Sequence, residues 1–101
     1  MDSRLTLQYK LEELLESKEV YYQPPESIKI TYPAIIYSHD GIFSTSSNDK
    51  KYVRRDKYLI TVVSKLPDHP VVNKILDLPY TSYVREYRSN NLYHVVLSIQ
   101  L

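Results

Sequence analysis

The C-terminal segment, residues 81–101, constrains the fold more than any other part of the chain. Its larger apolar residues occupy odd positions: Tyr83, Tyr87, Tyr93, Val95, Leu97 and Ile99. Because successive side chains in a strand alternate between two faces, this spacing predicts two strands that each bury one face. Placing Tyr83 opposite Leu97 and Tyr87 opposite Tyr93 requires an odd number of loop residues. This favours a three-residue Ser89–Asn91 turn over a two-residue Asn-Asn turn. The segment therefore predicts a β-hairpin.

Two other segments have the spacing of helices with one buried stripe. In residues 3–17 the stripe consists of Leu7, Leu11, Leu14 and Leu15. In residues 69–77 it consists of Val72, Ile75 and Leu76, with Asp68 as the expected N-cap and Pro70 in the first turn. Leucines three, four and seven positions apart share one helix face, so both segments are predicted to pack against a common core.

The remaining strands are predicted at about residues 28–38 and 52–64, and a further short strand can precede Pro24. Residues 38–50 are small, polar and rich in turn formers, so they are predicted to form a long loop. The resulting order, α-β-β-α-β-β, favours a single α+β domain over residues 1–101. Two helices are expected on one face of a mostly antiparallel sheet.

Composition excludes several classes of protein. The chain has 101 residues, 43% of them hydrophobic, no cysteine and a net charge of +1. A disulfide framework and thiolate metal sites are therefore excluded. The sequence has no signal-peptide pattern and no run of about 18 apolar residues, so we expect a protein made in the cytoplasm with no membrane partner.

The side chains that could take part in catalysis or metal binding do not form a recognisable catalytic pattern. The histidines His39, His69 and His94 fall on three different predicted elements, without the spacing of metal ligands. His94 would face Glu86 in the proposed hairpin register, as a cross-strand charge pair. His39 and Asp40 precede a serine-rich segment, but no strand-turn-helix elbow supplies oxyanion donors. We therefore expect no enzyme activity, no metal and no cofactor.

One dense basic cluster stands out in the chain. It comprises Lys50, Lys51, Arg54, Arg55 and Lys57. Strand alternation would place Arg54 on one face and Arg55 with Lys57 on the other. The cluster can bind phosphate groups without sequence preference, or it can be a charged edge strand that resists aggregation.

Two further sets of residues are candidates for assembly. Leu5 and Tyr9 lie beside the buried stripe of the first helix, where they can cover a neighbouring subunit or extend the core over a wider arc. His39, Gly41 and Phe43 belong to the predicted 38–50 loop, which we expect to be mobile in the free protein and ordered on assembly.

Taken in order, these elements resemble the small tail-completion or tail-terminator proteins of long-tailed bacteriophages and their prophages. The resemblance spans nearly the whole chain. It is carried by the order and spacing of residues 32–37, 56–63 and 67–70, and of 78–80 leading to 90–94. None of these stretches is a catalytic signature.

The resemblance implies a non-enzymatic virion protein. Such proteins form a ring, commonly a hexamer, at the head-proximal end of the tail tube, where they end tail growth and join the head connector. The expected partners are further copies of the chain, the tail-tube protein, the connector or stopper protein and DNA passing through the channel. The basic cluster is a candidate for the channel wall, on its charge alone. A head-completion stopper protein and a small nucleic-acid-binding module are the alternatives.

Overall fold

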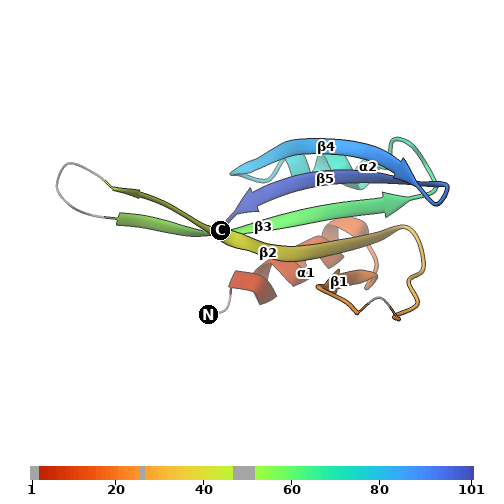
Figure 1. The fold of residues 1–101 in the computed structure, drawn as a ribbon, viewed down its shortest axis with the longest axis horizontal. Coiled ribbons are helices and arrows are strands. Elements are labelled where there is room, and N and C mark those ends of the chain that lie inside the picture. Colours follow the sequence, from red (N-terminus) through yellow and green to blue (C-terminus); the bar gives the residue numbers. More distant parts are fainter. Residues whose placement is uncertain (1–2, 26, 47–51) are drawn as a thin grey trace.

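The computed structural model describes residues 3–25, 27–46 and 52–101, which form an α+β fold (Figure 1). The elements in these residues are α1 (Ser3–Leu15), β1 (Val20–Tyr22), β2 (Ala34–Ser46), β3 (Tyr52–Ser64), α2 (Pro70–Leu76), β4 (Thr81–Ser89) and β5 (Leu92–Gln100). The strands make one sheet in the order β1-β2-β3-β5-β4. Both helices lie on the same face of that sheet, as predicted.

The core lies between the helices and this face of the sheet. Helix α1 contributes Leu7, Leu11 and Leu15, and α2 contributes Val71 and Ile75. The facing strand residues include Ile35, Tyr37, Ile60, Val62, Val95 and Leu97. The predicted stripe of α1 is confirmed for Leu7, Leu11 and Leu15, and Leu14 is partly buried. Helix α2 is rotated so that Val71 is fully buried and Val72 and Leu76 are only partly buried.

The start of α2 differs from the prediction in its capping residue. His69, not Asp68, is the N-cap, and its Nδ1 accepts a hydrogen bond of 3.1 Å from the backbone N–H of Val71. Pro70 occupies the first turn, where the missing N–H costs nothing because it would have no partner inside the helix. Histidine thus performs here the capping role that aspartate more often performs.

The predicted short strand before Pro24 is present as β1. It pairs in parallel with β2, with Val20 opposite Ile35, and makes the sheet mixed. The strand predicted at 28–38 was placed too early, because β2 begins at Ala34. Pro33 immediately precedes β2, and a proline has no N–H to donate to a sheet.

The predicted loop over residues 38–50 is wrong for its described part. His39, Gly41 and Phe43 lie within β2, which continues to Ser46 opposite β3. A register shift between His39 and Ile42 marks a bulge, and Gly41 there has a φ of 102°, a conformation that favours glycine. Cross-strand hydrogen bonds from β3 therefore override the turn-forming composition.

The C-terminal hairpin is confirmed, but its turn is the two-residue one that the alternation had argued against. Ser89 pairs with Leu92, and the two loop residues Asn90 and Asn91 both have positive φ, 53° and 62°. A bulge at Val84 inserts one extra residue and restores the predicted pairing of Tyr83 with Leu97.

Between the turn and that bulge the predicted register is off by one residue. Tyr87 pairs with His94 instead of Tyr93, and the two rings stack with centroids 4.7 Å apart. Glu86 faces Val95, so the predicted Glu86–His94 charge pair is not formed. As a consequence Tyr83 and Tyr87 lie on opposite faces of the sheet, although both positions are odd.

Candidate assembly surface

Residues 40–46 of β2 and 52–56 of β3 extend beyond the rest of the sheet, and we call these two segments the arm (Figure 1). Strand β3 pairs with β5 only from Lys57 onward, and β1 pairs with β2 only as far as Tyr37. The arm is therefore a two-stranded ribbon in which neither face is covered by a helix. Isolated two-stranded ribbons are at best marginally stable in water.

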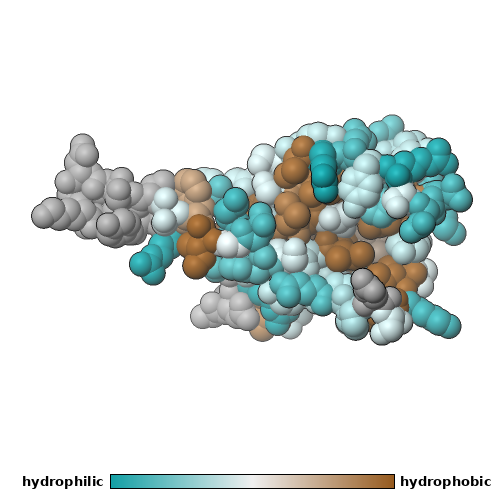
Figure 2. Space-filling view, viewed as in Figure 1, coloured by the Kyte–Doolittle hydropathy of each residue, from teal (hydrophilic) through white to brown (hydrophobic). Residues whose placement is uncertain are grey.

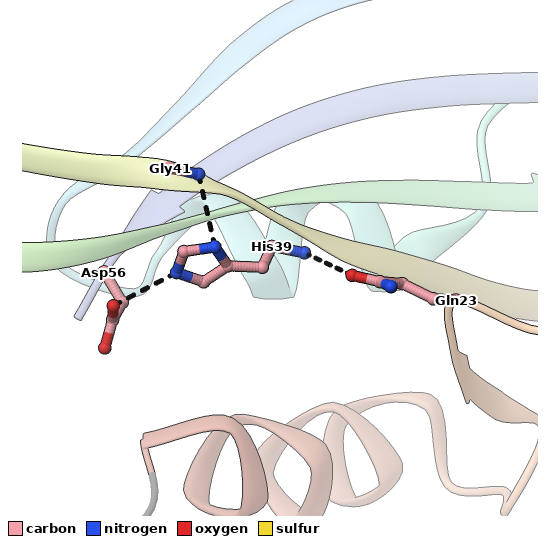
Figure 3. A network of polar contacts seen from close by, with 4 residues as sticks. All are labelled: Gln23, His39, Gly41 and Asp56. Carbon is pink, nitrogen blue, oxygen red and sulfur yellow. Dashed lines mark hydrogen bonds and ion pairs between the residues drawn. The ribbon is translucent and has the colours of Figure 1, made fainter.

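A network of polar contacts fixes the base of the arm (Figure 3). His39 Nε2 lies 3.1 Å from Asp56 Oδ1, and the Gly41 backbone N–H donates to His39 Nδ1 across 3.4 Å. The backbone N–H of His39 donates to the side-chain oxygen of Gln23, just beyond β1. Asp56 also exchanges two backbone hydrogen bonds of 2.8 Å with Leu101. These contacts tie the arm to both β1 and the chain's last residue.

The contacts of His39 fix the orientation of its ring. Because Nδ1 accepts from Gly41, the ring proton belongs on Nε2, which donates to Asp56. Both ring nitrogens thus have a partner within the chain. The network is suited to holding the bulged backbone in place.

The basic cluster is divided between the two faces of the arm, as alternation predicted. Register places Arg54 on the face that continues the helix-covered side, whereas Arg55 and Lys57 lie on the opposite face. The Arg55 guanidinium sits 4.0 Å from the centre of the Tyr80 ring, and Lys57 Nζ is 4.0 Å from Asp40 Oδ2. Within the described residues Arg54 has no ion-pair partner. Lys50 and Lys51 lie outside the described residues.

The arm also exposes large apolar side chains. Ile42 is 61% exposed and Phe43 39% exposed, and Figure 2 shows hydrophobic residues at the surface of the arm. Ile42 pairs with Asp56 and shares its face with Arg54, whereas Phe43 pairs with Arg55 on the other face. Phe43 was among the residues predicted for assembly, whereas Ile42 was not, because a segment expected to be a loop has no defined faces.

A second unpartnered region is the outer edge of the sheet at β4. Every residue of β4 except Thr81 is exposed, including Tyr83 and Tyr87. A sheet edge of nine residues presents unpaired backbone groups to any other chain. The edge of β1, on the other side of the sheet, is only three residues long.

A groove of about 210 Å³ lies between α2 and β4. Its walls include Val72, Leu76, Tyr83 and Val95, and acidic side chains of Asp68 and Glu86 line it as well. The Tyr83 hydroxyl donates to Glu86 Oε1 across 3.0 Å. The groove could not be found from the sequence, because its lining comes from three elements and depends on the bulge that returns Tyr83 to the helix side.

Leu5 and Tyr9, the residues predicted at a subunit interface, lie one turn apart on α1. They are 41% and 65% exposed, so they are not part of the core. They belong to neither the arm nor the α2–β4 groove. Their role as an interface stays a prediction.

Comparisons with known proteins add no family to these observations. No family model matches the chain, and no curated protein matches its sequence. Among residues 3–25, 27–46 and 52–101, no three metal-binding side chains cluster in a way that could hold an ion. In the same residues, no helix has both the length and the hydropathy needed to cross a bilayer.

Proposed function

We propose that this protein is a non-enzymatic virion component that assembles into a ring at the head-proximal end of a phage tail tube. There it ends tail growth and provides the surface that joins the head. The observation that carries the proposal is the arm, which projects from the sheet and exposes Ile42 and Phe43. Such a ribbon has little to stabilise it in a single chain, so a partner is expected to cover it.

Self-association suits this surface better than a small ligand does. Each chain has one projecting arm at one end of the sheet and one bare edge strand, β4, along its side. Contacts between two different surfaces of identical chains are heterologous, and they generate a ring when the rotation closes. The resemblance in sequence order to tail-terminator proteins points to the same kind of assembly.

The charges of the arm bear on the channel that such a ring would enclose. Arg55 and Lys57 share the face of the arm opposite to Arg54, and each has one partner within its own chain. Repeated around a ring axis, the cations of that face give a mild positive field along which DNA can pass without tight binding.

Electron microscopy of the purified protein, alone and mixed with the tail-tube protein, tests the proposal. Rings that cap tubes of defined length are the expected result, and phage lacking the gene should make tails of abnormal length. Binding to the portal side of the head instead of the tube would replace this function with that of a stopper. A protein that stays monomeric and binds DNA tightly at physiological salt would identify a nucleic-acid-binding module.

A further inference from the structure

We infer that the arm of one copy of this chain docks into the α2–β4 groove of the next copy. The inference rests on the proposed self-assembly and names the two surfaces that meet. The first of these surfaces is the face of the arm that carries Ile42 and Arg54. Ile42 is 61% exposed, against 39% for Phe43, and Arg54 has no ion-pair partner among the described residues.

The groove complements that face in both polarity and charge. Val72, Leu76 and Val95 offer an apolar wall, while Asp68 and Glu86 supply two negative charges. Pockets that hold drug-sized molecules usually measure about 300–1,000 Å³. At about 210 Å³ the groove is smaller and suits one or two protein side chains. The Ile42 side chain, with Arg54 on the same face of the arm, therefore matches an apolar groove lined by acidic residues.

The arm cannot fill the groove of its own chain. Ile42 pairs with Asp56 near the start of β3, whereas the groove residue Val95 pairs with Val62. Six residues of strand separate these positions, which is about 20 Å at the usual rise. The arm extends from the sheet in the direction away from Val62 (Figure 1). A second copy is therefore the occupant that brings the two surfaces together.

Each chain supplies one arm and one groove, so the contact can repeat from copy to copy. A heterologous contact of this kind leaves no surface of either type unused once the ring closes. In this contact the face of the arm that carries Phe43 and Arg55 is directed away from the neighbour's groove. Arg55 packs on Tyr80 of its own chain. The two faces of the arm thus provide matched positions for a test.

Cysteine cross-linking tests the contact directly, because the natural chain has no cysteine. Ile42→Cys is mixed with Asn73→Cys, an exposed position that lines the groove, under mild oxidation. A disulfide needs Cβ atoms about 3.5–4.5 Å apart, so efficient cross-linking reports a specific contact. We expect the mixture to form a mixed dimer. The matched mixture of Ile42→Cys with Tyr9→Cys, on α1, should not.

Charge reversal gives a second, independent readout. Arg54→Glu should raise the protein concentration needed for half-assembly by at least about tenfold, because it places like charges beside Asp68 and Glu86. Glu86→Arg combined with Arg54→Glu should recover most of that loss. Arg55→Glu is the matched control, since it makes the same charge change on the other face. Circular dichroism confirms that each variant is folded.

These experiments can overturn the arm-in-groove contact and the proposed function independently of each other. Equal effects of Arg54→Glu and Arg55→Glu, or cross-linking to Tyr9→Cys instead of Asn73→Cys, overturn the arm-in-groove contact while rings remain. Absence of any cross-link also overturns it. Cross-linking to Asn73→Cys without rings on tail tubes supports the contact and overturns the tail-terminator function.

Discussion

Strand β3 runs through two contrasting environments. Its second half, Tyr58–Ser64, lies between β2 and β5 and is mostly buried, with Ile60 and Val62 under the helices. Its first residues, 52–55, belong to the arm and are paired with β2 alone. One continuous strand therefore stabilises the domain at one end and offers an uncovered surface at the other. The number of neighbouring strands, not the strand itself, makes the difference.

Truncating one isoleucine in each of the two regions should give the largest difference in stability. Ile60 is fully buried and Ile42 is 61% exposed. Ile60→Ala should lower the free energy of unfolding by about 2–5 kcal/mol, because it removes buried methyl groups and leaves a cavity. Ile42→Ala should change it by less than about 0.5 kcal/mol. Urea denaturation of the monomer measures both values. A large loss from Ile42→Ala would show that the arm contributes to monomer stability.

A smaller effect is expected at the turn of the exposed β4–β5 hairpin. Asn91 has a φ of 62°, which a β-branched residue adopts only with strain. Asn91→Val should destabilise the protein by about 1–2 kcal/mol. Asn91→Gly, the preferred residue of this turn type, is the control and should cost nothing. If both variants have the same stability, the two-residue turn does not determine the register of β4.

In the buried region, the hydroxyl of Tyr37 should contribute about 1 kcal/mol to the free energy of unfolding. Its hydroxyl donates to Gln8 Oε1 across 2.6 Å, so Tyr37→Phe should destabilise the protein by about 0.5–1.5 kcal/mol. Tyr9→Phe on the exposed side of α1 is the control and should have no measurable effect. Thermal unfolding near neutral pH compares the two.

The Tyr37 side chain should also make the stability of the folded protein depend on pH in the alkaline range. Burial raises the pKa of Tyr37 above the ordinary tyrosine value of 10.0, although Arg4 opposes the shift. The folded protein therefore holds this proton more tightly than the unfolded chain does. The resulting stability is complete below pH 10.0 and is lost as the pH rises through the folded pKa. The stability difference between wild type and Tyr37→Phe should shrink over that range, and an unchanged difference would contradict a raised pKa.

The smallest effect is expected at the base of the arm. His39 and Asp56 form a partly exposed pair, and such pairs contribute about 0–1 kcal/mol. His39→Ala should thus leave global stability nearly unchanged. Hydrogen exchange of residues 42–44 should become faster, because the bulge loses its side-chain contact. Unchanged exchange there would show that backbone pairing alone holds the arm.

Elements with strong periodicity could be predicted from the amino-acid sequence alone. The leucine stripe of α1 and the alternation of β5 predicted the buried faces, because burial of apolar area is the main driving force and acts at fixed spacings. The basic cluster and its division between two faces followed from the same alternation. The α+β arrangement with both helices on one face followed from the order of these elements.

The arm, the turn and the groove depend on contacts between residues far apart in the sequence. Residues 38–46 have the composition of a loop, yet β3 supplies partners for their backbone groups, and the long-range pairing outweighs weak local preferences. The bulge at Val84 shifts the alternation of β4 by one residue, so the face of each tyrosine depends on pairing with β5. The α2–β4 groove exists because that shift returns Tyr83 to the helix side, a position fixed by contacts between distant residues and not by the residues around it.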